Sequence, residues 1–227
     1  MRAPAGEVPV TPAAAMSVAP PTVGGMGFTS AWSISCHEDS VIADLAQRTA
    51  AAVEADRTCP RARRRWAAWQ RAPLPDHRTW WTGTPAEDEA IRSFQDLTRP
   101  GRHVDDLCTF PFVDEIWDRQ PDQELMFVSV HSKAYPVSAL FHAIGPERAA
   151  LLPGWCGNFV LTAAEVRGAL PAVERALGFG PEERARAQRQ IWLDSEPRES
   201  VLDGPLRAWR AAARAGLGLC GLAFHVE

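Results

Sequence analysis

The sequence has almost no lysine or tyrosine and no long apolar run. Lys133 is the only lysine among 24 basic residues, and nine tryptophans stand against one tyrosine. With abundant Ala, Gly and Pro, this composition indicates a GC-rich genome such as an actinobacterial one, and it carries no information about function. No stretch of about 18 apolar residues occurs, so neither a transmembrane helix nor a membrane partner is predicted.

An excess of positive charge is also missing. The 24 basic and 28 acidic residues give a formal net charge of −4. Proteins that bind nucleic acids usually carry a basic excess or a basic stripe. The basic cluster at residues 61–65 lies on a predicted helix and is interpreted as a solvated face. A nucleic-acid partner is therefore not expected.

Closely spaced cysteine pairs are the third absence. The five cysteines are Cys36, Cys59, Cys108, Cys156 and Cys220. An odd number of cysteines without a Cys-x-x-Cys pair argues against a disulfide framework and against a zinc site. We therefore expect a cytoplasmic protein with reduced thiols, and neither a metal nor a cofactor.

The chain of 227 residues is long enough for one sizeable core. Residues 1–27 are rich in Ala, Pro, Val and Gly, and prolines and Glu7 interrupt any apolar core of signal-peptide type. We predict a disordered tail over residues 1–27, with Met16 and Met26 as alternative start sites. Residues 28–227 show no repeat and no linker and are predicted to form a single α+β domain.

Period-two alternation at residues 28–34 predicts a half-buried strand, and helical spacing of apolar residues predicts the helices that follow. Thr84, Pro85 and Glu87 form a start signal of N-cap, N1 and N3 residues. The predicted elements before residue 124 are a strand at 28–34, a helix at 38–55, a basic helix from 60, a capped helix to about 98, and a loop at 101–123 with one helical turn near 114–118.

The densest apolar part of the chain runs from Glu124 to Gly178, and we expect it to form the centre of the fold. Thr162 and Glu165 form a capping box, and Pro171 is expected to kink the helix that follows. The predicted elements here and beyond are a central strand at 125–130, a helical patch at 137–144, a turn at 153–158, a strand at 159–161, helices at 162–177, 182–193 and 206–215, and a final strand at 217–226. The fold class is α+β, with a small mixed or antiparallel sheet covered by five to six helices.

Three segments resemble the YfbM-like family, small bacterial α+β proteins of unknown function. They are the turn and capped helix at 154–166, the ending in which a helix at 205–215 leads through Gly216 into the last strand, and Trp80-Trp81-Thr82-Gly83. The resemblance covers about half of the chain and implies the same α+β fold. It transfers no catalytic residue, because none is established for the family. This chain is longer and has additional tryptophans and the Ala/Pro-rich tail.

Cys156 is a candidate nucleophile, because it lies between glycines in a turn just before a strand and a helix. A catalytic thiol needs a base within reach to form the thiolate. His131 and His142 are near it in sequence and are the candidate bases. The simpler interpretation is a buried structural cysteine and two ordinary histidines, since cysteine is among the most buried residue types.

Two other patterns have simpler interpretations. Residues 103–106 contain one histidine and two aspartates, but we interpret them as a solvated loop rather than a cation site. Residues 216–221 formally match G-x-G-x-x-G. They precede a terminal strand, so a bound phosphate would have no helix N-terminus to contact.

The tryptophans and arginines between Pro60 and Gly83 give the first functional hypothesis. Tryptophan and arginine are the usual anchors of protein interfaces. We expect a non-enzymatic protein- or peptide-binding module, such as an immunity-type protein, with an exposed apolar patch. The candidate binding residues are Arg64, Trp66, Trp69, Trp80 and Trp81. The alternative is a small enzyme that tailors a peptide or natural product with a Cys/His site.

Overall fold

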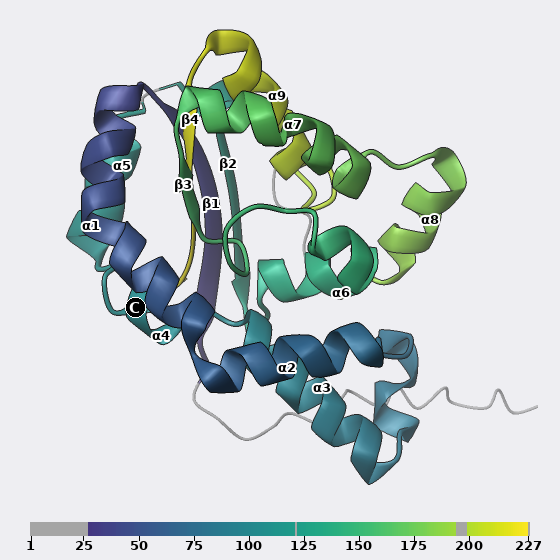
Figure 1. The fold of residues 1–227 in the computed structure, drawn as a ribbon. Coiled ribbons are helices and arrows are strands. Elements are labelled where there is room, and N and C mark those ends of the chain that lie inside the picture. Colours follow the sequence, from purple (N-terminus) through teal and green to yellow (C-terminus); the bar gives the residue numbers. More distant parts are fainter. Residues whose placement is uncertain (1–26, 121, 194–198, 227) are drawn as a thin grey trace, which may run out of the picture.

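The protein is described by a computed structural model that covers residues 27–120, 122–193 and 199–226 (Figure 1). Four antiparallel strands form one sheet with the order β2-β1-β4-β3. The strands are β1 (Thr29–His37), β2 (Met126–Ser132), β3 (Phe159–Leu161) and β4 (Gly218–Val226). The predicted α+β class with an antiparallel sheet is confirmed. The predicted tail lies outside the described residues, apart from Gly27.

The described residues form nine α-helices and two 3-10 helices, more than the five to six predicted. They are α1 (Asp39–Thr58), α2 (Pro60–Arg71), η1 (His77–Thr82), α3 (Pro85–Thr98), α4 (Arg102–Asp105), α5 (Phe110–Asp118), η2 (Gln123–Leu125), α6 (Pro136–Ala149), α7 (Ala163–Leu177), α8 (Pro181–Arg189) and α9 (Gly204–Ala215). No helix in the described ranges is long and apolar enough to cross a membrane.

The segment predicted to be a loop, residues 101–123, is instead mostly helical. Phe112, Val113 and Ile116 are buried on one face of α5, at the spacing of an amphipathic helix. In α4, Asp105 accepts hydrogen bonds from the backbone N–H and the Nδ1 of His225, both at 2.7 Å. The interpretation of residues 103–106 as a solvated loop is therefore wrong.

The prediction that residues 125–130 form the central strand is also wrong, because β2 lies at the edge of the sheet and β1 and β4 occupy its centre. Every residue of β1 after Thr29 is buried, so its predicted half-burial does not hold either. The serines of this segment had indicated a solvent-exposed face of the strand. They are buried, and two of them have bonded hydroxyls: Ser30 Oγ donates to the carbonyl of Ala134 at 2.6 Å, and Ser35 Oγ is bonded to Nε2 of His37 at 2.8 Å.

Helices cover both faces of the sheet (Figure 1). Helices α1, α4 and α5 enclose one core layer, which includes Ala31 of β1 and its β4 partner Phe224. Helices α6, α7 and α9 enclose the other layer, in which Trp32 and Trp209 are buried. Residues on neighbouring positions of a strand point to opposite faces, so the single strand β1 supplies side chains to both layers.

Side chains complete the edge of β4 beyond the short strand β3. The N–H of Ala223 donates to Oδ1 of Asn158 at 2.7 Å, and Asp105 accepts from His225 as described above. These contacts satisfy backbone donors that would otherwise form an open sheet edge. Asn158 thereby ties the segment before β3 to the centre of the sheet.

Several local signals are confirmed in the helices. The capping boxes at Thr84 and Thr162 are both present, and Gly216 ends α9 in the left-handed conformation with φ of 69°. Helix α7 is continuous through Pro171, as one helix of 15 residues. The break in a helix lies instead in α6, at Gly145, where φ is 75°.

Helices α2 and α3 form a layer outside the sheet and pack against α6 (Figure 1). Trp69 of α2 is at the centre of this layer. Its ring centroid lies 4.9 Å from that of Phe94 and 6.2 Å from that of Phe141. Trp69 is 4% exposed. Its burial fixes α2 on α6, and places Trp66, one helical turn earlier, beside the segment that follows α6.

Candidate functional site

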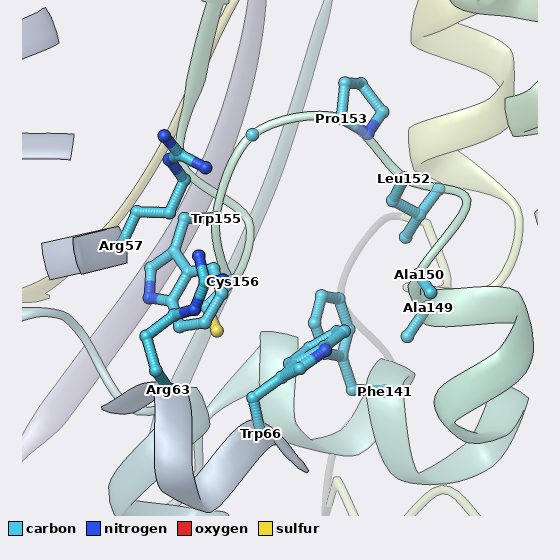
Figure 2. Close-up of a pocket in the computed structure, with 11 residues that line it drawn as sticks. Arg57, Arg63, Trp66, Phe141, Ala149, Ala150, Leu152, Pro153, Trp155 and Cys156 are labelled. Atoms are coloured by element: carbon cyan, nitrogen blue, oxygen red, sulfur yellow. The ribbon is translucent and has the colours of Figure 1, made fainter. Parts of the chain in front are cut away.

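A cavity of about 210 Å³ opens between α2, the end of α6 and the segment that follows α6 (Figure 2). Its walls come from parts of the chain that are distant in sequence. The lining residues are Arg57, Arg63, Trp66, Phe141, Ala149, Ala150, Leu152, Pro153, Gly154, Trp155 and Cys156.

The wall that carries Trp155 is a tight hairpin turn. The N–H of Trp155 donates to the carbonyl of Asn158 and the N–H of Asn158 donates to the carbonyl of Trp155, both at 2.9 Å. The two residues between them, Cys156 and Gly157, have φ of 45° and 84°. Two successive positive φ values are typical of a type I′ turn, which favours Asn-Gly. A cysteine in this conformation costs about 1–2 kcal/mol relative to a right-handed one.

Contacts with the core hold this turn in place. Trp32 Nε1 donates to the carbonyl of Gly157 at 3.0 Å, and Asn158 binds β4 as described above. A Cβ atom added to Gly157 would lie 2.6 Å from Cγ2 of Val137, so the turn fits tightly between β1 and α6. The turn therefore presents Trp155 to α2 in a fixed position.

Aromatic rings form much of the cavity wall. The ring of Trp66 lies 5.5 Å from that of Trp155 and 6.2 Å from that of Phe141, and it also contacts Trp69 at 5.4 Å. These centroid distances are typical of favourable aromatic pairs. Trp66 is half-buried, so it contributes both to the packing of α2 and to the cavity.

Two guanidinium groups border the same cavity. Arg57 donates two hydrogen bonds to the exposed carboxylate of Glu54, at 2.7 and 2.8 Å. Arg63 is exposed and makes no ion pair within the part of the chain that the structure describes. Its charge, after that of Arg57, helps to lower the pKa of the Glu54 carboxylate, and its guanidinium is exposed at the opening.

The surroundings of Arg63 are basic. Residues 60–83 contain six arginines and a single acidic residue, Asp76, in a chain whose net charge is −4. Arg65 pairs with Asp96, and Arg78 pairs with Asp76. Helix α2 thus forms a local positive face on an acidic protein, which raises the local concentration of anionic ligands.

Cys156 lines the cavity, but its thiol is buried. Burial raises the pKa of Cys156 well above its usual range, so the thiol stays protonated at neutral pH. His142 is bonded through Nε2 to Oε1 of Gln190 at 3.0 Å, and burial lowers its pKa to about 4. His131 lies on β2 and is bonded through Nε2 to Oγ of Ser129 at 3.0 Å. Each candidate base is thus bonded to a residue other than Cys156.

The five predicted binding residues have different environments. Trp66 lines the cavity and Arg64 is exposed on α2, whereas Trp69 is buried in the core, which corrects its assignment to a surface patch. Trp80 is half-buried, donates through Nε1 to the carbonyl of Pro75 at 3.1 Å, and packs on Trp192. Trp81 is 63% exposed.

Sequence reasoning missed Arg57, Arg63, Phe141 and Trp155 as site residues. Arg57 lies in the last turn of α1, Arg63 belongs to the basic cluster of α2, and Phe141 lies in α6. No sequence spacing connects these positions, because the cavity is made by packing of separate elements. The glycines around Trp155 and Cys156 were a usable signal, since they indicated a tight turn whose side chains point in unusual directions.

Within the described ranges, no group of three or more His, Cys, Asp or Glu side chains is placed to hold a metal ion. No protein-family model, curated protein or solved structure matches this chain. The resemblance to the YfbM-like family thus stays a prediction, and the geometry of the cavity is the basis for a functional proposal.

Proposed function

We propose that the protein is a non-enzymatic binding module that holds a protein or peptide partner at the outer face of α2, with one apolar side chain of the partner inserted in the cavity. The observation that supports this most is the aromatic-walled cavity beside the unpaired Arg63. Its volume of about 210 Å³ is below the roughly 300–1,000 Å³ of most small-molecule sites. A single anchoring side chain suits this volume better than a cofactor.

The residues around the cavity are of the type that dominates protein interfaces. Tryptophan and arginine are enriched among the residues whose truncation weakens binding most. Arg64 of α2 and Trp81 of η1 are exposed residues of the same two types. The basic face favours an acidic partner, and its small size favours a protein over nucleic acid, which needs many phosphate contacts.

We place the protein in the cytoplasm. All five cysteines are free thiols, as expected for a reducing compartment. In this setting the role of a partner-binding or immunity-type protein depends on recognition of one acidic protein present in the same cell.

The alternative function is a small enzyme that tailors a peptide or natural product through Cys156. Its support is that the cysteine lines the cavity. The raised pKa of the buried thiol argues against it, because the thiolate is the reactive form. Replacement of Cys156 by alanine separates the two functions, since a binding module keeps its affinity for the partner.

Photo-crosslinking in the native cell tests the proposal. A photoreactive phenylalanine at Arg64, which is exposed on α2, should capture a defined protein partner. The same group at Ala164, which is exposed on α7, serves as the control position. Ala150 follows the last residue of α6 and lines the cavity. In the variant Ala150→Phe the larger side chain fills the opening, so capture from position 64 should be abolished. Equal capture from both positions, or capture that survives Ala150→Phe, contradicts the proposal.

A further inference from the structure

The cavity is lined by apolar side chains and by two arginines, and its volume of about 210 Å³ is close to that of one amino-acid residue. Figure 2 shows Arg57 and Arg63 on one side of the opening, next to Trp155, and Leu152, Ala149 and Phe141 on the other side. A ligand that uses both parts must present an apolar group and an anionic group a few ångströms apart.

We infer that the inserted group is the C-terminal residue of the partner, with its apolar side chain in the cavity and its α-carboxylate on Arg63. This inference rests on the proposed function and specifies which part of the partner is recognised. A C-terminal residue carries its side chain and its carboxylate on the same Cα atom. Both groups can therefore occupy a cavity of about 210 Å³ together.

An internal acidic residue fits the cavity less well. In an extended peptide, successive side chains point to opposite sides, so an acidic residue next to an apolar anchor directs its carboxylate away from the cavity. An acidic residue two positions away lies on the same side but about 7 Å along the chain. A C-terminal residue needs no such spacing, because its carboxylate and its side chain are attached to the same Cα atom.

Arg63 is the better carboxylate ligand of the two arginines. Arg57 already donates two hydrogen bonds to Glu54, whereas Arg63 makes no ion pair in the described part of the chain. A guanidinium binds a carboxylate with two parallel hydrogen bonds, which gives both strength and orientation. Arg57 and Glu54 neutralise each other, so Arg63 supplies the positive charge that the ligand carboxylate meets.

Synthetic peptides test the inference on the full-length protein. The probe is acetyl-Gly-Gly-Ser-Leu with a free C-terminal carboxylate. Its C-terminal amide removes the charge, and acetyl-Gly-Gly-Ser-Gly with a free carboxylate removes the apolar side chain. Acetyl-leucine serves as a small-molecule carboxylate. Binding is measured by titration calorimetry and by shifts of the tryptophan indole N–H signals in NMR spectra.

We expect the leucine carboxylate peptide to bind about tenfold more tightly than its amide, because a charge-assisted hydrogen-bond pair to a carboxylate contributes about that factor. It should bind at least about tenfold more tightly than the glycine peptide, which lacks the apolar side chain that is buried in the cavity. Arg63→Gln should remove the preference for the carboxylate. The matched variant Arg61→Gln removes the same charge from an exposed position of the same helix, outside the cavity lining, and should change the affinity less than about threefold.

Each other outcome overturns the inference. Equal affinity for carboxylate and amide, a preference that survives Arg63→Gln, or no binding by any peptide excludes C-terminal recognition. Acetyl-leucine binding as tightly as the peptide indicates a small acid as the ligand. Capture of a partner from position 64 that Ala150→Phe abolishes still supports the proposed function in these cases, so the two failures are distinguishable. Near-ultraviolet circular dichroism of the tryptophans verifies that each variant is folded.

Discussion

Acidification should destabilise the protein through two buried histidines, His37 and His142. His37 ends β1, is 2% exposed and is bonded through Nε2 to Oγ of Ser35. His142 is 9% exposed and is bonded to Gln190. Burial lowers the pKa of each side chain from 6.5 to about 4, and the charge of Arg119 adds to this effect at His37. In the folded protein both imidazoles are therefore neutral at pH 7.

The sign of the effect follows from proton binding. A histidine with a lowered pKa binds fewer protons in the folded state than in the unfolded chain, so stability rises with pH between the two pKa values. The stability that depends on the neutral histidine is fully present above pH 6.5 and is lost as the pH falls towards about 4. At pH 4.5 each histidine should have removed about 2.5 kcal/mol, and the pair about 5 kcal/mol. This loss is comparable with the about 5–15 kcal/mol by which whole domains are stable.

Urea unfolding followed by tryptophan fluorescence at several pH values measures this loss. Near pH 5.2, each histidine should contribute a slope of about 1.2 kcal/mol per pH unit to the free energy of unfolding. The variant His142→Gln keeps a hydrogen-bonding side chain beside Gln190 but cannot titrate, so its slope near pH 5.2 should be lower by about 1.2 kcal/mol per pH unit. Carboxylates with lowered pKa values, such as Glu87 and Glu115, titrate in both the wild type and the variant. Their contribution to the pH dependence therefore cancels in the difference between the two slopes. An unchanged slope in His142→Gln refutes the argument from burial.

Three substitutions test the packing around the cavity and the sheet. Gly157→Ala should lower the free energy of unfolding by about 2–4 kcal/mol, as measured by urea titration, because φ is 84° and the new Cβ would lie 2.6 Å from Val137. A loss below about 0.5 kcal/mol would show that the turn is not tightly held. Asp105→Ala should cost about 1–3 kcal/mol and speed hydrogen exchange at the amide of His225, which loses its acceptor. Cys156→Ala should leave partner capture unchanged, because the buried thiol stays protonated and has no role in a binding module, whereas an enzyme that uses this thiol would lose its activity.

Local signals in the sequence predicted the elements that depend on local chemistry. The capping boxes at Thr84 and Thr162 and the glycine at 216 predicted helix ends correctly, because each signal is contained within four residues or fewer. Of α5, only the helical turn at 114–118 was predicted, although Phe112, Val113 and Ile116 have helical spacing. The polar residues between them suggested a loop, and only the packing against β1 and β4 shows which face is inside.

Local sequence signals could not predict the order of the strands in the sheet. The run at 125–130 is more apolar than β1, so it was placed at the centre of the sheet. The centre is instead β1, whose serines are small enough to be buried under the helices, with Ser30 bonded to the carbonyl of Ala134 and Ser35 to His37. The cavity lining was likewise predicted only in part, because it depends on contacts between distant parts of the sequence. Trp66 was identified from composition, whereas Arg57 and Trp155 are brought to the cavity by long-range packing.

The cavity has a rigid apolar part and an adaptable charged part. Trp155 is fixed by a turn that Trp32 of β1 and Asn158 tie to the centre of the sheet, and Trp66 is held by Trp69 in the core. The guanidinium of Arg63 lies on the exposed side of α2 and is free to turn towards a ligand. A preorganised apolar wall loses little entropy on binding, so it selects the side chain, whereas mobile exposed charges mainly speed and orient the encounter. Substitutions of the wall should therefore change the dissociation rate, and substitutions of exposed arginines outside the cavity should change the association rate.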